Sequence, residues 1–158
     1  MAYLEVTYKK IRSLRTSDKV EVWLALDRAN QFVVIKKILF TGLPYALLKE
    51  HQFSICPLVI HCIESSTETI VIEEFIQGDS LLERLKQKNY LTEQEAQNIL
   101  IQLCDGLAPL HKCGIIHRDI KPSNLIMQNN GIVRLIDFDA ARVIINAICK
   151  IILLLHDI

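Results

Sequence analysis

The feature that most constrains this chain is a pair of polar turns set between apolar segments in its second half. The first turn carries Asp119, Lys121 and Asn124, and the second carries Asp137 directly after an apolar run. Two carboxylates, an ammonium group and an amide are the groups that orient a hydroxyl and neutralise a transferred phosphoryl group. Phosphoryl transfer depends mainly on positioning and charge, so these side chains would suffice for it.

Each of these residues has a role by chemistry alone. Asp119 could accept a hydroxyl proton, and Lys121 could neutralise charge on the phosphate. Asn124 and Asp137 could supply the oxygen ligands that Mg2+ prefers. The alternative without a function is a solvated loop with scattered charges. The spacing of these four residues along the sequence argues against it.

The run His117-Arg118-Asp119-Ile120-Lys121-Pro122-Ser123-Asn124 resembles the catalytic loop of the protein kinase family, of the serine/threonine and bacterial-like type. The resemblance implies that Asp119 is the catalytic base and Lys121 the phosphate contact. It also implies that Asn124 and Asp137 bind Mg2+. ATP and Mg2+ would then be the cofactors, and a protein carrying Ser or Thr the substrate.

The first half of the chain predicts β structure. Residues 6–14 and 20–26 alternate apolar and polar side chains around a polar turn, which predicts a hairpin, and residues 31–39 form a β-branched strand. By the same resemblance, Lys36 contacts the α- and β-phosphates of ATP and Val22 packs on adenine.

A helix is predicted at residues 45–53, and its Glu50 is the acid that could pair with Lys36 or could equally be a surface carboxylate. Residues 58–62 and 69–74 predict a second hairpin that leads into the interlobe hinge. There, backbone groups near Glu74 and Ile76 would meet the adenine edge. Glu73 takes the gatekeeper position, where a carboxylate must find a partner or water.

Two helices are predicted before the catalytic turn. Asp79 or Ser80 can cap a short one, and Thr92 with Glu95 forms a capping box for a longer one. The apolar residues that recur at helical spacing in the longer helix are predicted to be core: Ala96, Ile99, Leu100, Leu103, Leu107 and Leu110. A hairpin around residues 129–131 would then present Asp137 opposite Asn124.

Several positions depart from the family pattern. Arg15, Ser17 and Val20 stand where the three glycines of the phosphate-covering loop would be, and none lets backbone amides approach a phosphate as closely. Asp139 stands where the glycine usually follows the metal-binding acid and its phenylalanine. These departures count against tight ATP binding but not against the fold.

Composition excludes some functions. A formal net charge of +0 provides no global field for nucleic acid or an anionic membrane surface. The five cysteines form no Cys-x-x-Cys pair and no signal peptide is recognisable, which predicts reduced thiols and a cytoplasmic location. With 158 residues, the chain is short for a two-lobed kinase fold of roughly 250 residues or more.

Residues 143–158 are apolar and do not resemble an activation segment. The run is shorter than the ~20 apolar residues of a membrane span and is interrupted by Lys150, so no span is predicted. We expect a truncated or frame-shifted product, whose exposed C-terminal-lobe surface would require a partner to cover it.

The predicted fold class is α+β and protein-kinase-like but incomplete. Residues 1–76 would form a β-rich N-terminal lobe with one helix, residues 77–142 the first part of a helical C-terminal lobe, and residues 143–158 a tail. The predicted function is a serine/threonine protein kinase. One alternative is a non-catalytic pseudokinase or remnant that acts as a binding module. Another is a small-molecule phosphotransferase, which does not usually carry Lys121-Pro122 after the acid.

Overall fold

The computed structural model describes residues 7–144, which divide into two compact units. The first consists of the described part of Met1–Gln52 together with Pro57–Ile76. The second consists of Phe53–Cys56 and the described part of Gln77–Ile158. Except for its first two residues, the apolar tail predicted at 143–158 lies outside the described residues.

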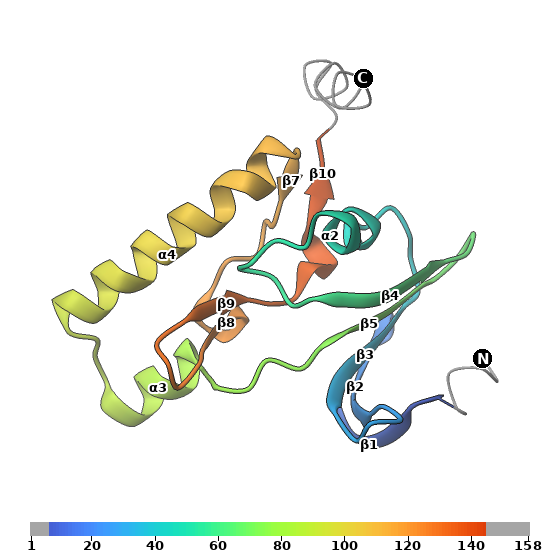
Figure 1. Ribbon diagram of the computed structural model, residues 1–158, viewed down its shortest axis with the longest axis horizontal. Coiled ribbons are helices and arrows are strands. Elements are labelled where there is room, and N and C mark those ends of the chain that lie inside the picture. The colour runs from blue at the N-terminus through green and yellow to red at the C-terminus, as the bar shows by residue number, and fades with distance from the viewer. Residues whose placement is uncertain (1–6, 145–158) are drawn as a thin grey trace. The chain divides into compact units, whose positions relative to one another are not determined.

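The first unit contains a five-stranded antiparallel sheet with the strand order β1-β2-β3-β5-β4 (Figure 1). Its strands are β1 (Lys9–Thr16), β2 (Val20–Leu26), β3 (Phe32–Ile38), β4 (Val59–Glu64) and β5 (Thr69–Glu74). The first hairpin was predicted at 6–14 and 20–26, but β1 continues to Thr16. The reason is a tight turn, because the Ser17 amide donates to the Val20 carbonyl at 2.8 Å and the Val20 amide donates to the Ser17 hydroxyl at 3.1 Å.

One face of this sheet carries the core of the unit. Strand alternation places apolar side chains there at every second position. The buried cluster consists of Tyr8, Ala25, Val33, Ile35 and Ile72. Lys36 lies on the opposite face of β3 from Val33 and Ile35 and is buried there, while Lys37 shares their face and is only half-buried.

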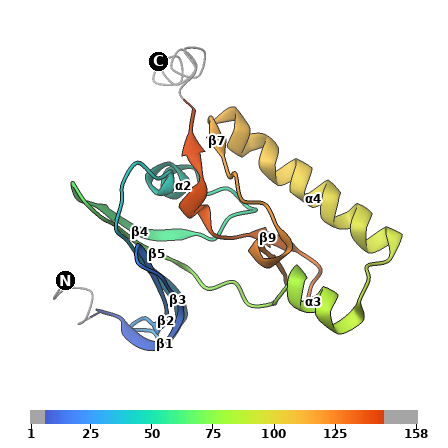
Figure 2. The ribbon, with the colours of Figure 1, turned by 180° about the vertical axis from the view of Figure 1, so that it is seen from behind.

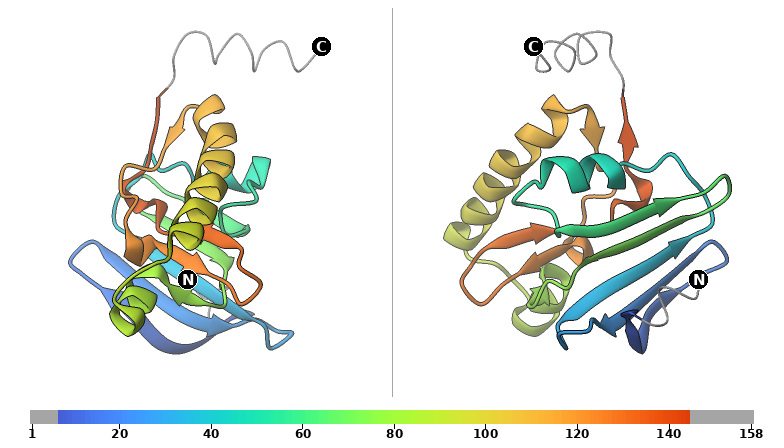
Figure 3. Two further views of the ribbon diagram at one scale, coloured as in Figure 1. Left: turned by 90° about the vertical axis from the view of Figure 1, so that its left-hand side faces the viewer. Right: turned by 45° about the vertical axis from the view of Figure 1, so that its right-hand side comes forward.

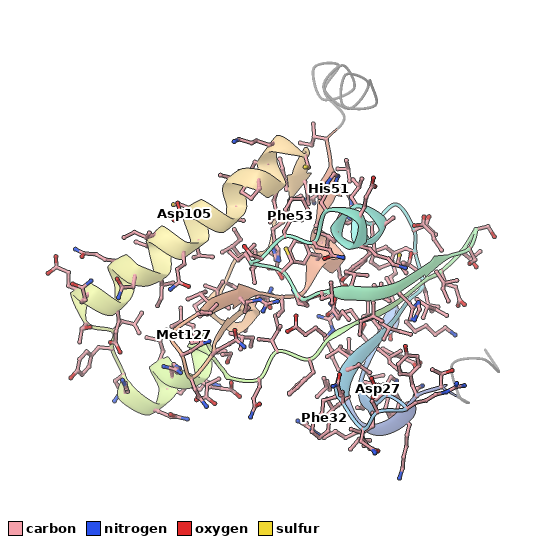
Figure 4. The ribbon with its side chains drawn as sticks, in the orientation of Figure 1. Asp27, Phe32, His51, Phe53, Asp105 and Met127 are labelled. Atoms are coloured by element: carbon pink, nitrogen blue, oxygen red, sulfur yellow. The ribbon has the colours of Figure 1, made fainter. Side chains whose placement is uncertain are left out.

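Helix α2 (Tyr45–His51) packs on β4 (Figure 3). It is shorter than the predicted 45–53, because Gln52 adopts a left-handed backbone with φ 49° and donates its amide hydrogen to the Leu48 carbonyl. This left-handed conformation ends the helix. Phe53 therefore lies beyond it (Figure 4), and the buried residues of the helix are Tyr45 and Leu48.

The second unit combines two helices with short strands. The helices are α3 (Leu81–Lys88) and α4 (Glu93–Lys112), and Figure 2 shows the β8–β9 hairpin beside α3. The strands are β6 (Asp79–Ser80), β7 (Ile115–Ile116), β8 (Leu125–Met127), β9 (Val133–Leu135) and β10 (Arg142–Val143). Two 3-10 turns lie at the predicted functional segments: η1 (Pro122–Asn124), which includes Asn124, and η2 (Phe138–Ala140), which follows Asp137.

Both helices begin at capping boxes. Ser80 caps α3 with Glu83, and Thr92 caps α4 with Glu95, as the sequence predicted for α4. Ile99, Leu103 and Leu110 of α4 are buried. Leu100 was predicted to be core and is 60% exposed, because it lies about 100° around the helix from Ile99 and so leaves the buried stripe.

The short segment Phe53–Cys56 belongs to the second unit through contacts with β9 and α4. The Leu135 amide donates to the Ile55 carbonyl at 2.8 Å, and the Arg134 guanidinium donates to the Cys56 carbonyl at 2.6 Å. Gly106 of α4 leaves the space that the Ile55 side chain fills. The chain thus contributes a loop to the second unit before it returns to the sheet.

Within residues 7–144, no helix is both long enough and apolar enough to cross a bilayer.

Candidate functional site

The predicted residues of the catalytic turn form one hydrogen-bonded cluster. The Asp119 carboxylate accepts hydrogen bonds from Lys121 Nζ at 2.7 Å and from Asn124 Nδ2 at 3.0 Å. Asn124 Nδ2 also donates to the Asp119 carbonyl at 2.9 Å. Because both hydrogens of this amide point at Asp119, its oxygen faces the other way.

His117 determines how this turn is held. Its ring is buried, and its Nδ1 accepts a hydrogen bond from the Asp119 amide at 3.2 Å. Since Nδ1 is the acceptor, Nε2 carries the hydrogen and donates to the Ile136 carbonyl at 3.0 Å. The ring also packs edge-on against Phe138, with 4.5 Å between centroids. His117 therefore ties the turn to the residue just before Asp137.

Asp137 lies at the end of the β8–β9 hairpin, next to the turn of Asn124. The Ile136 amide donates to the Asn124 carbonyl at 2.9 Å, and the charge of Asp137 acts on Asp119. Asp137 and Arg118 both have left-handed backbones, with φ 68° and φ 67°. Such conformations are costly for residues with side chains and concentrate at functional sites.

The electrostatics of the turn favour an ionised base. The pKa of Asp119 is lowered, first by the hydrogen bond from Lys121 and further by the hydrogen bond from Asn124 and the charge of Lys121. Partial desolvation and the neighbouring Asp137 act in the opposite direction. The net result is a carboxylate that stays charged at neutral pH and can accept a hydrogen bond from a hydroxyl.

The donor atoms at this place suit magnesium. Asn124 contributes an amide oxygen and Asp137 a carboxylate, and Mg2+ prefers such hard oxygen ligands. In the described part of the chain, no three His, Cys, Asp or Glu side chains gather as a metal-binding group. Mg2+ usually takes one or two protein ligands and completes its shell with phosphate oxygens and water, so a two-residue set fits it.

The other predicted residues lie in the first unit. Val22 is buried and stands directly opposite Lys36 in the β2–β3 register. Lys36 is buried as well, and its Nζ lies 2.9 Å from Glu73 Oε1 and 3.1 Å from the Tyr45 hydroxyl. Glu50, which the sequence offered as the partner of Lys36, is exposed on α2, and no ion pair joins it to Lys36 in the part of the chain that the structure describes.

Glu74 and Ile76 close the first unit. The Glu74 amide donates to the Leu58 carbonyl at 2.9 Å, and its carboxylate accepts from the Leu58 amide at 3.1 Å. Ile76 is buried and is the last residue of the unit. The contact of this backbone with adenine stays a prediction.

Sequence reasoning missed that Glu73 and Tyr45 contact Lys36. Adjacent acids at the end of a strand were visible, but which of them faces the lysine depends on the β3–β5 register, in which Val34 pairs with Glu73. Register is not encoded locally, so the alternation of β5 alone could not reveal the pair.

A β-rich first unit and a helical second unit with this catalytic turn define a protein of the kinase class. A model of the protein kinase domain matches residues 45–151, and the chain belongs to that family. The predicted α+β, kinase-like fold class is thereby confirmed.

Three curated relatives are named as serine/threonine-protein kinases. The chain is 41% identical over 87 residues to the serine/threonine-protein kinase PknA of Nostoc sp., which covers 54% of this chain and 15% of that protein. It is 42% identical over 74 residues to a probable serine/threonine-protein kinase PknB of Corynebacterium glutamicum, covering 47% of this chain and 12% of that protein. Identity to the serine/threonine-protein kinase cds1 of Schizosaccharomyces pombe is 35% over 153 residues, or 87% of this chain and 33% of that protein. The chain thus matches only a minor part of each relative's length.

Proposed function

We propose that this chain acts in a serine/threonine protein kinase, which transfers the γ-phosphoryl group of ATP to a hydroxyl of a protein. The observation that carries the proposal is the hydrogen-bonded cluster of Asp119, Lys121 and Asn124, tied through His117 to the segment of Asp137. The names of the relatives support the choice of substrate class.

Each residue would act through its position. The ionised Asp119 would orient the substrate hydroxyl and accept its proton as the phosphorus–oxygen bond forms. Lys121, which lies 2.7 Å from Asp119, would place positive charge beside the transferred group. In the first unit, Lys36 would bind the α- and β-phosphates of ATP.

The adenine and the metal would use the remaining predicted residues. Val22 would offer an apolar wall to adenine, and the backbone at Glu74 and Ile76 would meet its edge. Asn124 and Asp137 would hold Mg2+ through their oxygens. Bound Mg2+ supplies neutralisation of the phosphate charge in reactions of this class.

Transfer of labelled phosphate from ATP to a generic protein substrate tests the proposal. Asp119→Asn removes the base while keeping the shape of the side chain, and we expect labelling to fall by about 100-fold or more. Asp105→Asn is the matched control, because Asp105 is exposed on α4, away from the turn (Figure 4). Equal labelling by the wild type and Asp119→Asn would contradict the proposal that this chain acts as a kinase.

A non-catalytic binding module is the second candidate. It is favoured by the β1–β2 turn, which Ser17 and Val20 close with side-chain and backbone hydrogen bonds in place of a flexible glycine loop. For this candidate, Mg2+ and ATP should raise the melting temperature while wild type and Asp119→Asn show the same absence of turnover.

A reducing compartment such as the cytoplasm is our proposal for the location. It is supported by Cys62 and Cys104, which are free thiols.

A further inference from the structure

The first unit holds a buried ion pair in which Lys36 participates. Nζ of Lys36 lies 2.9 Å from Oε1 of Glu73, and both side chains are 5% exposed. Charged groups are rarely buried to this extent unless they are paired, because removing either charge from water is costly. The two charges therefore depend on each other to remain buried in the first unit.

The sheet brings these two residues together. Lys36 stands opposite Val71, and Glu73 stands opposite Val34, so the two side chains occupy a diagonal position on one face of neighbouring strands. Tyr45 adds a hydroxyl at 3.1 Å from the ammonium, from the first turn of α2. Tyr45 is fully buried, so its hydroxyl is held in place.

A second pair, between β3 and the residue just before β5, provides a comparison. Lys37 follows Lys36 on the other face of β3, and its Nζ lies 3.5 Å from Glu68 Oε2 with side chains 32% and 28% exposed. That pair is longer and reaches water. The difference identifies the Lys36–Glu73 pair as the one in which the carboxylate can govern the position and charge of its lysine.

We propose that Glu73 is the positioning residue for Lys36, which holds the ammonium charged and in place for the phosphates of a nucleotide. This inference rests on the proposed function, in which Lys36 binds those phosphates. It gives to a strand residue the task that the sequence suggested for Glu50 of the helix. Because Lys36 and Glu73 belong to one sheet, their pairing needs no movement of α2.

Glu73→Gln isolates the charge of this residue. Glutamine keeps the size of the side chain and can still form hydrogen bonds, but the buried amine loses the negative charge of Glu73. A buried amine that loses a neighbouring negative charge shifts toward its neutral form, which is more nucleophilic and attracts phosphate less. Glu68→Gln removes the same charge from the exposed pair and is the matched control.

The first readout is acylation of individual lysines by a water-soluble succinimidyl ester, followed by mass spectrometry. Relative to the exposed Lys9 in the same chain, we expect Lys36 of Glu73→Gln to react about tenfold faster than in the wild type. Glu68→Gln should leave the rate at Lys36 unchanged. Equal rates at Lys36 in Glu73→Gln and the wild type would overturn the proposal.

The second readout is binding of Mg2+ and ATP, measured by titration calorimetry without turnover. We expect Glu73→Gln to bind about tenfold more weakly and Glu68→Gln to bind like the wild type. Unchanged or tighter binding by Glu73→Gln would overturn the positioning role, since a carboxylate that competes with phosphate gives tighter binding when it is removed.

Two further results separate the possible failures. If the wild type binds no nucleotide, the proposed function fails, while acylation still decides whether Glu73 holds the ammonium. If circular dichroism shows that Glu73→Gln does not fold, Glu73→Asp replaces it. Its shorter carboxylate should leave Lys36 labelling between the wild-type rate and that of unfolded chain. Labelling and nucleotide affinity equal to the wild type in Glu73→Asp would then count against positioning.

Discussion

Asp119 depends on Lys121 more than on any other neighbour for its charge. The hydrogen bond from Lys121 is the largest cause of its lowered pKa, and the bond from Asn124 adds to it. A carboxylate whose pKa is lowered by folding stabilises the protein above its unfolded pKa, and this contribution is lost as pH falls through the folded pKa. The relevant window is thus acidic, below about 4.

Lys121→Ala should raise the pKa of Asp119, because it removes the largest lowering cause and leaves desolvation and Asp137 in place. A pH titration of the Asp119 side-chain carbon by NMR measures the change. Lys88→Ala is the control, since Lys88 bonds Glu95 and should move only that carboxyl. A titration midpoint of Asp119 that is the same in the wild type and Lys121→Ala would contradict this role.

Breaking the buried pair should cost stability, and removing both of its charges should not. We expect Glu73→Gln to lower the free energy of unfolding by about 3 kcal/mol, because it removes the carboxylate charge of Glu73 from beside the buried ammonium of Lys36. The double variant Lys36→Met with Glu73→Leu should be close to the wild type, since apolar residues of similar volume often replace buried pairs at little cost. Glu68→Gln should change stability by less than about 0.5 kcal/mol.

Denaturant unfolding of the double variant and of its two single variants, Lys36→Met and Glu73→Leu, measures the coupling between the two residues. If the double variant is as unstable as the sum of the single changes, the two side chains are not coupled and the pair is not the reason for the loss.

Among single residues, the sequence predicted most reliably the contacts between residues that are close together along the chain. Asp119, Lys121 and Asn124 are five positions apart at most, so the turn alone brings them together, and the structure shows that cluster. Lys36 and Glu73 are far apart along the chain, and their pairing depends on strand register. Glu50 was the nearer acid in the sequence, but α2 turns it to solvent.

Helix α4 and the segment Phe53–Cys56 meet at Gly106. A Cβ added at Gly106 would clash with the Ile55 side chain. It would lie 2.6 Å from the Cβ of Ile55 and 2.9 Å from the Cγ1 of Ile55. Alanine in a helix interior is ordinarily favoured over glycine by about 0.8–1 kcal/mol. Overpacking of a filled space costs about 1–3 kcal/mol. The loss of stability from the steric clash should therefore exceed the gain from the higher helix propensity of alanine.

Gly106→Ala should therefore lower the melting temperature rather than raise it. The measurement is thermal unfolding followed by circular dichroism. Ile55→Ala removes the contacts with Cγ1 and Cδ1 but keeps the contact with Cβ. In a double-mutant cycle, adding it to Gly106→Ala should therefore relieve part of the clash, so that the double variant is less destabilised than the sum of the two single changes. A higher melting temperature for Gly106→Ala than for the wild type would show that Ile55 has room to move.

Helix boundaries were predictable where a side chain marks them. Ser80 and Thr92 cap their helices with Glu83 and Glu95, and such motifs are local. The end of α2 was not predictable, because Gln52 is left-handed without being a glycine. Leu100 follows the apolar pattern of α4 yet is exposed, because helical spacing identifies a stripe but not how wide its buried part is.

At the scale of the whole chain, the first unit ends at Ile76 and the chain continues in the second unit from Gln77. The exchange at Phe53–Cys56 was not predictable. Its carbonyls accept hydrogen bonds from the Leu135 amide and the Arg134 guanidinium, which no side-chain pattern near residue 55 predicts. Family membership was accessible from the catalytic turn because that motif is contiguous.

The outer face of α4 carries two adjacent apolar side chains that reach water. Leu100 is 60% exposed and Ile101 is 59% exposed, on a helix whose neighbouring Gln97 and Asn98 are polar. Apolar side chains that stand together on a surface favour association. Because a second copy of the chain is always available in a purified sample, we expect self-association that increases with protein concentration.

Size-exclusion chromatography with light scattering checks this expectation across a range of concentrations. Leu100→Glu with Ile101→Lys should shift the chain toward the monomer, because it replaces both apolar side chains by charges while keeping the net charge unchanged. Gln97→Glu with Asn98→Lys makes the same charge change three positions earlier on the helix and should leave the association as it is in the wild type. A wild-type chain that stays monomeric at every concentration would show that these two side chains are too small a patch to hold a second copy. The exposed face of α4 would then impose no association on the chain.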